Sequence, residues 1–243
     1  MIHDKWVSRT VYASLGIQIV TTAISLDGLN YSLSEKDKIL HDILILEAFV
    51  QAVEAVFYIW VILALKKLKI MTPRRYLDWM ITTPTMLLTT IIFMEYLRFK
   101  DTRKPFTFTE FLKDHQTNIL KIFAYNWGML LFGYLGEVGY IDTKMSVLIG
   151  FVFFGLSFQV IYSEYAKHTD LGTKLFMFLI GVWSLYGVAA LLKIREKNTM
   201  YNLLDVVSKN FYGLLIYAYI RGIGQRKGQG SITEEGDNED VQG

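Results

Sequence analysis

A lysine and an aspartate near the end of the chain have the types and spacing for covalent chemistry inside an apolar helix. Lys209 follows Asp205 by four residues in the stretch DVVSKN, so a helix would place both side chains on one face. A charge inside a bilayer costs roughly 2.5–3.5 kcal/mol even on the mildest insertion scales, so this lysine needs an acidic partner. Its amine can also condense with an aldehyde cofactor. The spacing is compatible with a structural ion pair or with a lysine-bound aldehyde that has Asp205 as its counter-ion.

A polar stripe is expected on another helix, earlier in the chain. Asp78 is followed at helical spacings by Thr82, Thr85 and Thr89, on a helix that is otherwise apolar. Arg75 precedes Asp78 by one turn. We predict that Asp78 faces the lysine as a second carboxylate, steadied by Arg75. The threonines either support that carboxylate, Thr82 above all, or bond back to their own helix backbone.

Three polar residues share one face of another apolar stretch. Glu47, Gln51 and Glu54 are spaced four and three residues apart. Ser14 in the first apolar stretch and Asn210, directly after the lysine, could join them. A line of acids and amides supplies the oxygen ligands and negative field that a cation path needs. Alternatively, the glutamates are protonated or hydrogen-bonded and only hold helices together.

Long apolar helices are needed to position these side chains. The chain has 243 residues, of which 52% are hydrophobic. A bilayer core about 30 Å thick requires roughly 20 mostly apolar residues per helix. Stretches of this kind lie near 6–26, 43–65, 76–97, 118–138, 145–165, 172–192 and 201–220. We therefore predict an all-α, seven-transmembrane-helix bundle in residues 1–222, followed by a disordered acidic tail over 223–243.

The composition argues against several function classes. There are no cysteines, so there is no disulfide framework and no thiol chemistry. None of the four histidines pairs with another at metal-ligand spacing, so we predict no metal site. A net charge of +2 is too small to imply a nucleic-acid partner.

The longest connection runs over about 98–117 and contains the segment FTFTEFLKDH. This segment is either a short amphipathic piece on the membrane surface or a solvated loop. Lysine and arginine residues are nearly balanced between the two sides of the predicted bundle, so charge alone does not determine its orientation.

Two motifs resemble a known family. The segment RYLDWMITTPTMLL, from Arg75 to Leu88, resembles the third helix of the microbial (type 1) rhodopsins, and DVVSK resembles their retinal-lysine motif. The resemblance implies a rhodopsin-like fold with all-trans retinal bound to Lys209 as a protonated Schiff base. It further implies that Asp78 is the primary proton acceptor and counter-ion, with Asp205 as the second counter-ion. The retinal pocket would contain Tyr76, Trp79, Thr83, Met86, Met129, Gly133, Phe154, Ser157, Trp183 and Tyr186.

Two departures from the family pattern bear on function. Many outward proton pumps have a carboxylate proton donor eleven residues after the position of Asp78, where this chain has Thr89. A threonine cannot reload a Schiff base by direct acid donation, which weakens the case for a pump. In the pocket, Gly187 and Ala190 replace the usual proline and tryptophan and leave a looser lid.

The stripe of Glu47, Gln51 and Glu54 resembles the group-1 viral rhodopsins of giant viruses, also called viral channelrhodopsins. Light-gated cation channel activity has been described for that group. The resemblance therefore makes these three residues, with Ser14 and Asn210, candidates for an ion pathway.

The leading prediction is a retinal-binding photoreceptor that acts as a light-gated cation channel and not as an enzyme. A light-driven outward proton pump comes second and a sensory photoreceptor third. An ion-coupled transporter with a merely structural Asp205–Lys209 pair is the last alternative, since no inverted repeats or broken helices are visible. Expected partners are the lipid bilayer and the transported cations or protons. The resemblance implies an extracellular N-terminus and a cytoplasmic C-terminus, and a homo-oligomer because the family often forms trimers or pentamers.

Overall fold

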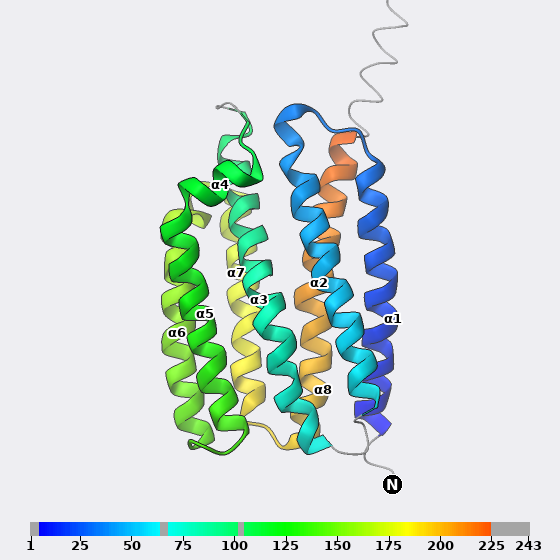
Figure 1. Ribbon diagram of the computed structural model, residues 1–243, viewed down its shortest axis with the longest axis vertical. Coiled ribbons are helices and arrows are strands. Elements are labelled where there is room, and N and C mark those ends of the chain that lie inside the picture. The colour runs from blue at the N-terminus through cyan, green and yellow to red at the C-terminus, as the bar shows by residue number, and fades with distance from the viewer. Residues whose placement is uncertain (1–4, 64–67, 102–104, 225–243) are drawn as a thin grey trace, which may run out of the picture.

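The computed structural model describes residues 5–63, 68–101 and 105–224, and long helices account for most of them. The long helices are α1 (Lys5–Asp27), α2 (Ile39–Ile62), α3 (Leu68–Phe99), α5 (Gln116–Glu137), α6 (Thr143–Glu164), α7 (Asp170–Ala190) and α8 (Ile194–Asp205). After α8 come the π-helical turn η4 (Val206–Asn210) and helical residues 211–224; we call α8, η4 and 211–224 together the seventh helix. The helices stand side by side as an upright bundle (Figure 1). The predicted seven-helix bundle is confirmed for the described part of the chain. Residues 225–243 of the predicted tail lie outside it.

Not every helix is apolar along its whole length. Within the described residues, four segments are long and apolar enough to cross a membrane by length and composition: 35–62, 71–99, 143–168 and 170–190. Two other helices, α1 and the seventh helix, bury polar side chains such as Gln18 and Asn202. These polar faces point into the bundle, where intramembrane polar groups are normally found. Exposed large apolar side chains such as Val20 and Met177 cover the outside.

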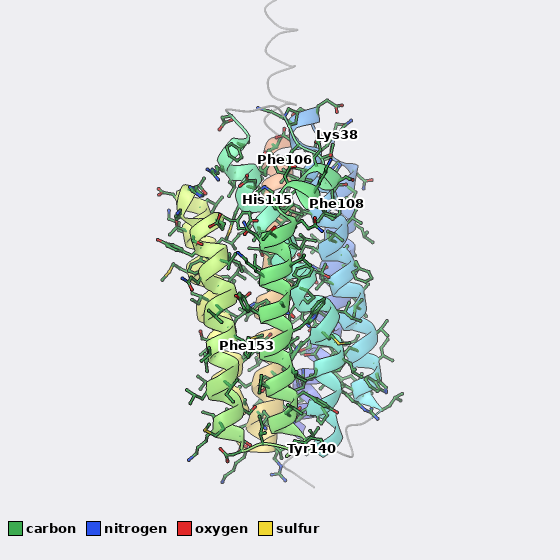
Figure 2. The ribbon with its side chains drawn as sticks, turned by 60° about the vertical axis from the view of Figure 1, so that its left-hand side comes forward. Lys38, Phe106, Phe108, His115, Tyr140 and Phe153 are labelled. Atoms are coloured by element: carbon green, nitrogen blue, oxygen red, sulfur yellow. The ribbon has the colours of Figure 1, made fainter. Side chains whose placement is uncertain are left out.

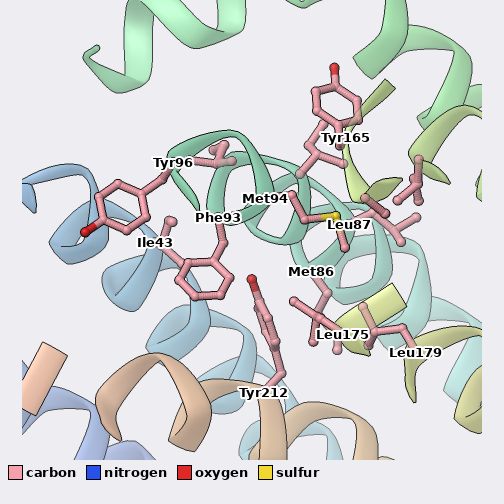
Figure 3. Packing of buried hydrophobic residues seen from close by; sticks show 14 of the residues in the cluster. Ile43, Met86, Leu87, Phe93, Met94, Tyr96, Tyr165, Leu175, Leu179 and Tyr212 are labelled. Atoms are coloured by element: carbon pink, nitrogen blue, oxygen red, sulfur yellow. The ribbon is translucent and has the colours of Figure 1, made fainter. Parts of the chain in front are cut away.

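The two halves of helix α3 contribute different kinds of side chain to the interior of the bundle. Its C-terminal half contributes apolar side chains to the main core, where Phe93 lies beside Ile43 of α2 and Tyr212 of the seventh helix (Figure 3). Its N-terminal half carries Arg75 and Asp78, both buried. Lipid tails are as apolar as the core side chains, so packing contacts and polar contacts between helices, rather than exclusion from water, hold such a bundle together.

The FTFTEFLKDH segment forms a short helix, α4 (Phe108–Asp114), rather than only a loop. Thr107 and Glu110 make a reciprocal capping box: Glu110 N donates to Thr107 Oγ1 at 3.2 Å, and Thr107 N donates to Glu110 Oε2 at 2.8 Å. Phe111 is buried, and its ring stacks on His115 with centroids 4.4 Å apart. The structure thus confirms that the segment is helical, and its location at the membrane surface stays a prediction.

His115 lies at the end of the bundle opposite Tyr140 (Figure 2). Its Nδ1 is 3.1 Å from the Tyr165 hydroxyl, and its Nε2 is 3.6 Å from a Glu95 carboxylate oxygen. Burial lowers the pKa of His115 below its ordinary value of 6.5, against the opposing effect of Asp114. The folded protein therefore binds fewer protons than the unfolded chain once the pH falls below that value.

The pH dependence of the protein's stability should reflect the titration of this partly buried histidine. Because the unfolded chain takes up the proton first, stability should decrease as the pH falls from about 6.5 toward 5. The variant His115→Gln should show a flatter decrease, measured as the thermal unfolding temperature at each pH. An equal slope in the wild type and the variant would show that His115 does not contribute.

Candidate functional site around Lys209

Lys209 lies in a one-turn widening of the seventh helix. Residues Val206–Asn210 form the π-helical turn η4, in which backbone hydrogen bonds reach back five residues instead of four. Single π turns inside α-helices often occur at functional sites. Ser208, Lys209 and Asn210 are all buried in this turn. Among the residues that the structure describes, Lys209 is the only buried lysine.

Three carboxylates surround the Lys209 amine. Nζ donates to Asp78 Oδ2 at 2.7 Å, and Glu54 Oε1 is 3.1 Å and Asp205 Oδ1 3.9 Å away. All four side chains are at most 2% exposed. Asp78 and Asp205 thus face the lysine as the sequence predicted. Glu54 was predicted only for an ion pathway, so its contact with the amine was missed by the sequence reasoning.

Arg75 pairs with Asp205 and not with Asp78, which differs from the prediction. Its guanidinium donates to Asp205 Oδ2 at 2.8 Å and also to Asn202, and both charged groups are fully buried. The long side chain reaches across to the seventh helix instead of bending back onto its own helix. Three further side chains donate to the Asp205 carboxylate, namely Tyr186 at 2.9 Å, Tyr58 at 3.0 Å and Trp79 at 3.4 Å.

The predicted threonine stripe of α3 has mixed roles. Thr82 donates to the backbone oxygen of Asp78 at 3.0 Å, so its hydroxyl does not support the Asp78 carboxylate directly. Thr85 donates to the backbone oxygen of Ile81 at 2.9 Å. Both hydroxyls therefore follow the alternative in which membrane-helix threonines bond back to their own backbone.

Buried polar side chains of α1, α2, α3 and the seventh helix form a polar column through the interior. The column is made by the contacts Thr89–Glu47, Ser25–Gln51, Gln18–Glu54, Thr21–Asn210, Ser14–Asn202 and Thr72–Asn198. All five predicted pathway residues belong to it, although Ser14 donates to the backbone of Asn202 and not to an acid of α2. The contribution of Gln18, Thr21 and Ser25 was missed. Their spacing of four, three and four residues from Ser14 places all of them on one helical face, which the sequence alone could have indicated.

Several atoms of the polar column lack a protein hydrogen-bond partner among the described residues. They include Gln18 Oε1, Glu47 Oε2, Gln51 Nε2 and Asn210 Nδ2. Buried polar atoms of this kind usually bind water or ions. Gly213 makes room for Gln51, since a Cβ at that position would lie 2.2 Å from Nε2. The column therefore has the chemistry of a hydrated path.

A cavity, here called the inner cavity, lies beside Lys209. Nine of the ten predicted pocket residues line it: Tyr76, Trp79, Thr83, Met86, Met129, Gly133, Phe154, Trp183 and Tyr186. Ser157 does not line it, because its hydroxyl is buried against α5 and donates to the backbone oxygen of Ile122 at 3.3 Å. Leu130, Val147, Phe151 and Tyr201 are among the lining residues that the sequence reasoning missed.

The inner cavity fits a long apolar aldehyde. Its walls are mostly aromatic and aliphatic, and Lys209 is one of the residues that line it. Glycines keep two aromatic rings close: a Cβ at Gly133 would lie 2.8 Å from the Tyr76 hydroxyl, and one at Gly187 2.6 Å from the Phe151 ring. A buried amine for attachment, apolar walls and nearby carboxylates as counter-ions are together the features that a retinal-type cofactor needs.

The family of the chain follows from comparison with known sequences. A family model for bacteriorhodopsin-like proteins matches residues 10–223. The chain belongs to this family. The predicted resemblance to microbial rhodopsins is thereby confirmed, and with it a retinal-binding fold that is integral to the membrane.

Solved structures agree with this assignment of a bacteriorhodopsin-like protein. The viral rhodopsin OLPVRII is 27% identical over 89% of this chain and 98% of its own, with a TM-score of 0.78. Xanthorhodopsin, a light-driven ion pump with a dual chromophore, is 14% identical over 93% and 96%, with a TM-score of 0.72. Halorhodopsin from Halobacterium salinarum is 12% identical over 93% and 96%, with a TM-score of 0.68. The last two share the fold alone. No curated protein sequence matches the chain.

Proposed function

We propose that this bacteriorhodopsin-like protein is a light-gated cation channel that holds all-trans retinal on Lys209. One observation carries the proposal: the polar column runs directly past the Lys209 amine. Glu54 accepts a hydrogen bond from Gln18 at 2.6 Å and lies 3.1 Å from Lys209 Nζ, so one carboxylate belongs to both the column and the site. When bound, retinal supplies light absorption and a light-driven change of shape.

The residues around Lys209 have separate roles in this proposal. Asp78 is the counter-ion and the acceptor of a proton from Nζ, because its Oδ2 is the closest carboxylate oxygen and its Oδ1 has no partner among the described residues. Asp205 is the second counter-ion. It is already held by Arg75, Tyr58 and Tyr186, which makes it the less available acceptor.

Glu54 is the proposed link between the site and the path. While Nζ carries a positive charge, the Glu54 carboxylate is drawn toward it and toward Gln18. Transfer of that proton to Asp78 removes the attraction, which frees Glu54 oxygens for a cation in the column. Ser14, Glu47, Gln51 and Asn210 are the other proposed pathway residues. We further propose an extracellular N-terminus and a cytoplasmic C-terminus.

A light-driven outward proton pump is the second candidate, and one observation favours it. Thr89 replaces the acidic proton donor of many pumps, yet its hydroxyl donates to Glu47 of α2. A carboxyl group therefore lies beside the position of the missing donor. In a pump, Glu47 would return a proton toward Lys209 from the position beside Thr89.

Photocurrents recorded while the membrane voltage is stepped separate the two functions. For a channel, the current should reverse sign with the cation gradient. Glu54→Gln should change the conductance about threefold or more, or shift the reversal potential, because it removes a negative charge from the path. Glu164→Gln is the matched control: it removes an exposed acid at the end of α6, outside the column and both cavities, and should leave the current unchanged. A current that stays outward at every voltage would support the pump instead.

A further inference from the structure

A second cavity, here called the outer cavity, adjoins the inner cavity where α6 begins and α7 ends. The two cavities share Val147, Phe151 and Ala190 as wall residues. The remaining wall of the outer cavity includes Leu148 and Leu191, which are 60% and 53% exposed. The inner cavity is therefore separated from the outer surface of the bundle by a single layer of side chains.

Phe151 forms the partition between the cavities. It lines both of them and is nevertheless 36% exposed. On the facing helix its ring lies against Gly187, where a Cβ would come within 2.6 Å of two ring atoms. The neighbouring wall residue of α7 is also small, Ala190. Phe151 is therefore the bulkiest side chain of the shared wall, and it lies against a glycine.

The helices on either side of the partition are loosely joined. α5 and α6 contact each other along much of their length, whereas α6 and α7 touch far less. A weakly packed pair of helices with a small-residue wall opens at low cost, because few packing contacts are lost.

We propose that the opening between α6 and α7 is the passage through which retinal moves from the bilayer to Lys209, with Phe151 as its gate. The proposal rests on the proposed attachment of retinal to Lys209. Retinal is a long apolar polyene that dissolves in lipid, and the exposed rim residues Leu148, Leu191 and Leu192 suit such a molecule.

Two lysines line the outer cavity, Lys144 and Lys197, and their amines could meet the aldehyde before Lys209 does. Lys197 lines the outer cavity, but its Nζ is held by Glu137 Oε2 at 2.8 Å. Among the residues that line the inner cavity, Lys209 is the only lysine, so an aldehyde that has passed Phe151 meets that lysine alone.

Uptake of all-trans retinal by retinal-free protein in lipid nanodiscs tests the passage. The rate of appearance of the visible absorbance band, its final height and its position are recorded for each variant. Leu148→Trp fills only the outer cavity and should slow uptake about fivefold, a barrier increase of roughly 1 kcal/mol, with unchanged final height and position. Val152→Trp is the matched control, since Val152 is 58% exposed on the same helix and lines neither cavity. Phe151→Ala should speed uptake.

A second readout does not depend on the covalent bond. All-trans retinol, which cannot attach to an amine, should quench the tryptophan fluorescence of the Lys209→Ala variant, with the same order of rates when the passage substitutions are added. If Leu148→Trp takes up the polyene as fast as Val152→Trp, and Phe151→Ala brings no acceleration, the passage is wrong. If the wild type forms no coloured product while retinol quenching still follows the predicted order, the attachment to Lys209 fails and the passage stands.

Discussion

The variant Lys209→Ala should stay colourless after all-trans retinal is added, whereas the wild-type protein should develop a visible absorption band. The expected loss is complete, because Lys209 is the only buried lysine among the described residues and it lines the inner cavity. An alanine offers no nitrogen for attachment. The absorption spectrum of the purified protein is the measurement. A coloured Lys209→Ala variant would refute the assignment of the attachment site.

Two controls separate lost chemistry from lost folding. Lys209→Arg keeps a cation beside Asp78 and Glu54, but a guanidinium remains charged and does not condense with an aldehyde, so this variant should fold and remain colourless. Lys197→Ala removes a lysine that lines the outer cavity only and should leave the colour intact. Loss of colour in Lys197→Ala with normal folding would show that the amine of Lys209 is not sufficient.

The variant Arg75→Leu should lose about 3–5 kcal/mol of unfolding free energy, which is the usual cost of breaking a buried ion pair from one side. Arg75 and Asp205 are both fully buried and 2.8 Å apart, so removing the guanidinium leaves the Asp205 carboxylate without its closest cation. The double variant Arg75→Leu/Asp205→Asn should recover part of the loss, because the uncompensated charge is then gone. Unfolding by denaturant in detergent measures all of these variants.

Arg74 provides the matched control for the variants of the Arg75–Asp205 pair. It neighbours Arg75 in the chain, but its guanidinium lies over the Trp60 ring at 4.3 Å in an exposed setting. Arg74→Leu should therefore cost less than about 1 kcal/mol. Equal losses for Arg74→Leu and Arg75→Leu, or strictly additive losses in the double variant, would contradict a strong buried pair.

The contact of Glu54 with Lys209 links the proposed ion path directly to the proposed retinal attachment site. Two counter-ions on α3 and the seventh helix would leave the α2 stripe as a separate ion path. With Glu54 at 3.1 Å from Nζ, a change of charge at the amine acts directly on a pathway residue. In the proposed channel, the first step of gating would therefore need no intervening conformational relay. The Glu54→Gln photocurrent therefore tests the coupling as well as the path.

The sequence by itself determined the features that depend on neighbours along one helix. Runs of apolar residues predicted the seven helices, since the length of an apolar stretch sets whether it can span a bilayer. The four-residue spacing of Asp205 and Lys209 predicted that both lie on one face, because the helical repeat is local. The helix ends differ by a few residues, for instance α3, predicted over 76–97 and observed at Leu68–Phe99, because polar flanking residues continue a helix beyond its apolar part.

Only the tertiary structure decided which side chains meet across helices. Arg75 turned out to pair with Asp205, Glu54 to contact Lys209, and Ser157 to lie outside the inner cavity. The π turn η4 affects only the contact made by Lys209, since one extra residue in a turn rotates the side chains in and after that turn relative to an ideal α-helix. Contacts of this kind depend on the rotation, height and spacing of neighbouring helices, which the spacing of residues within a single helix does not encode.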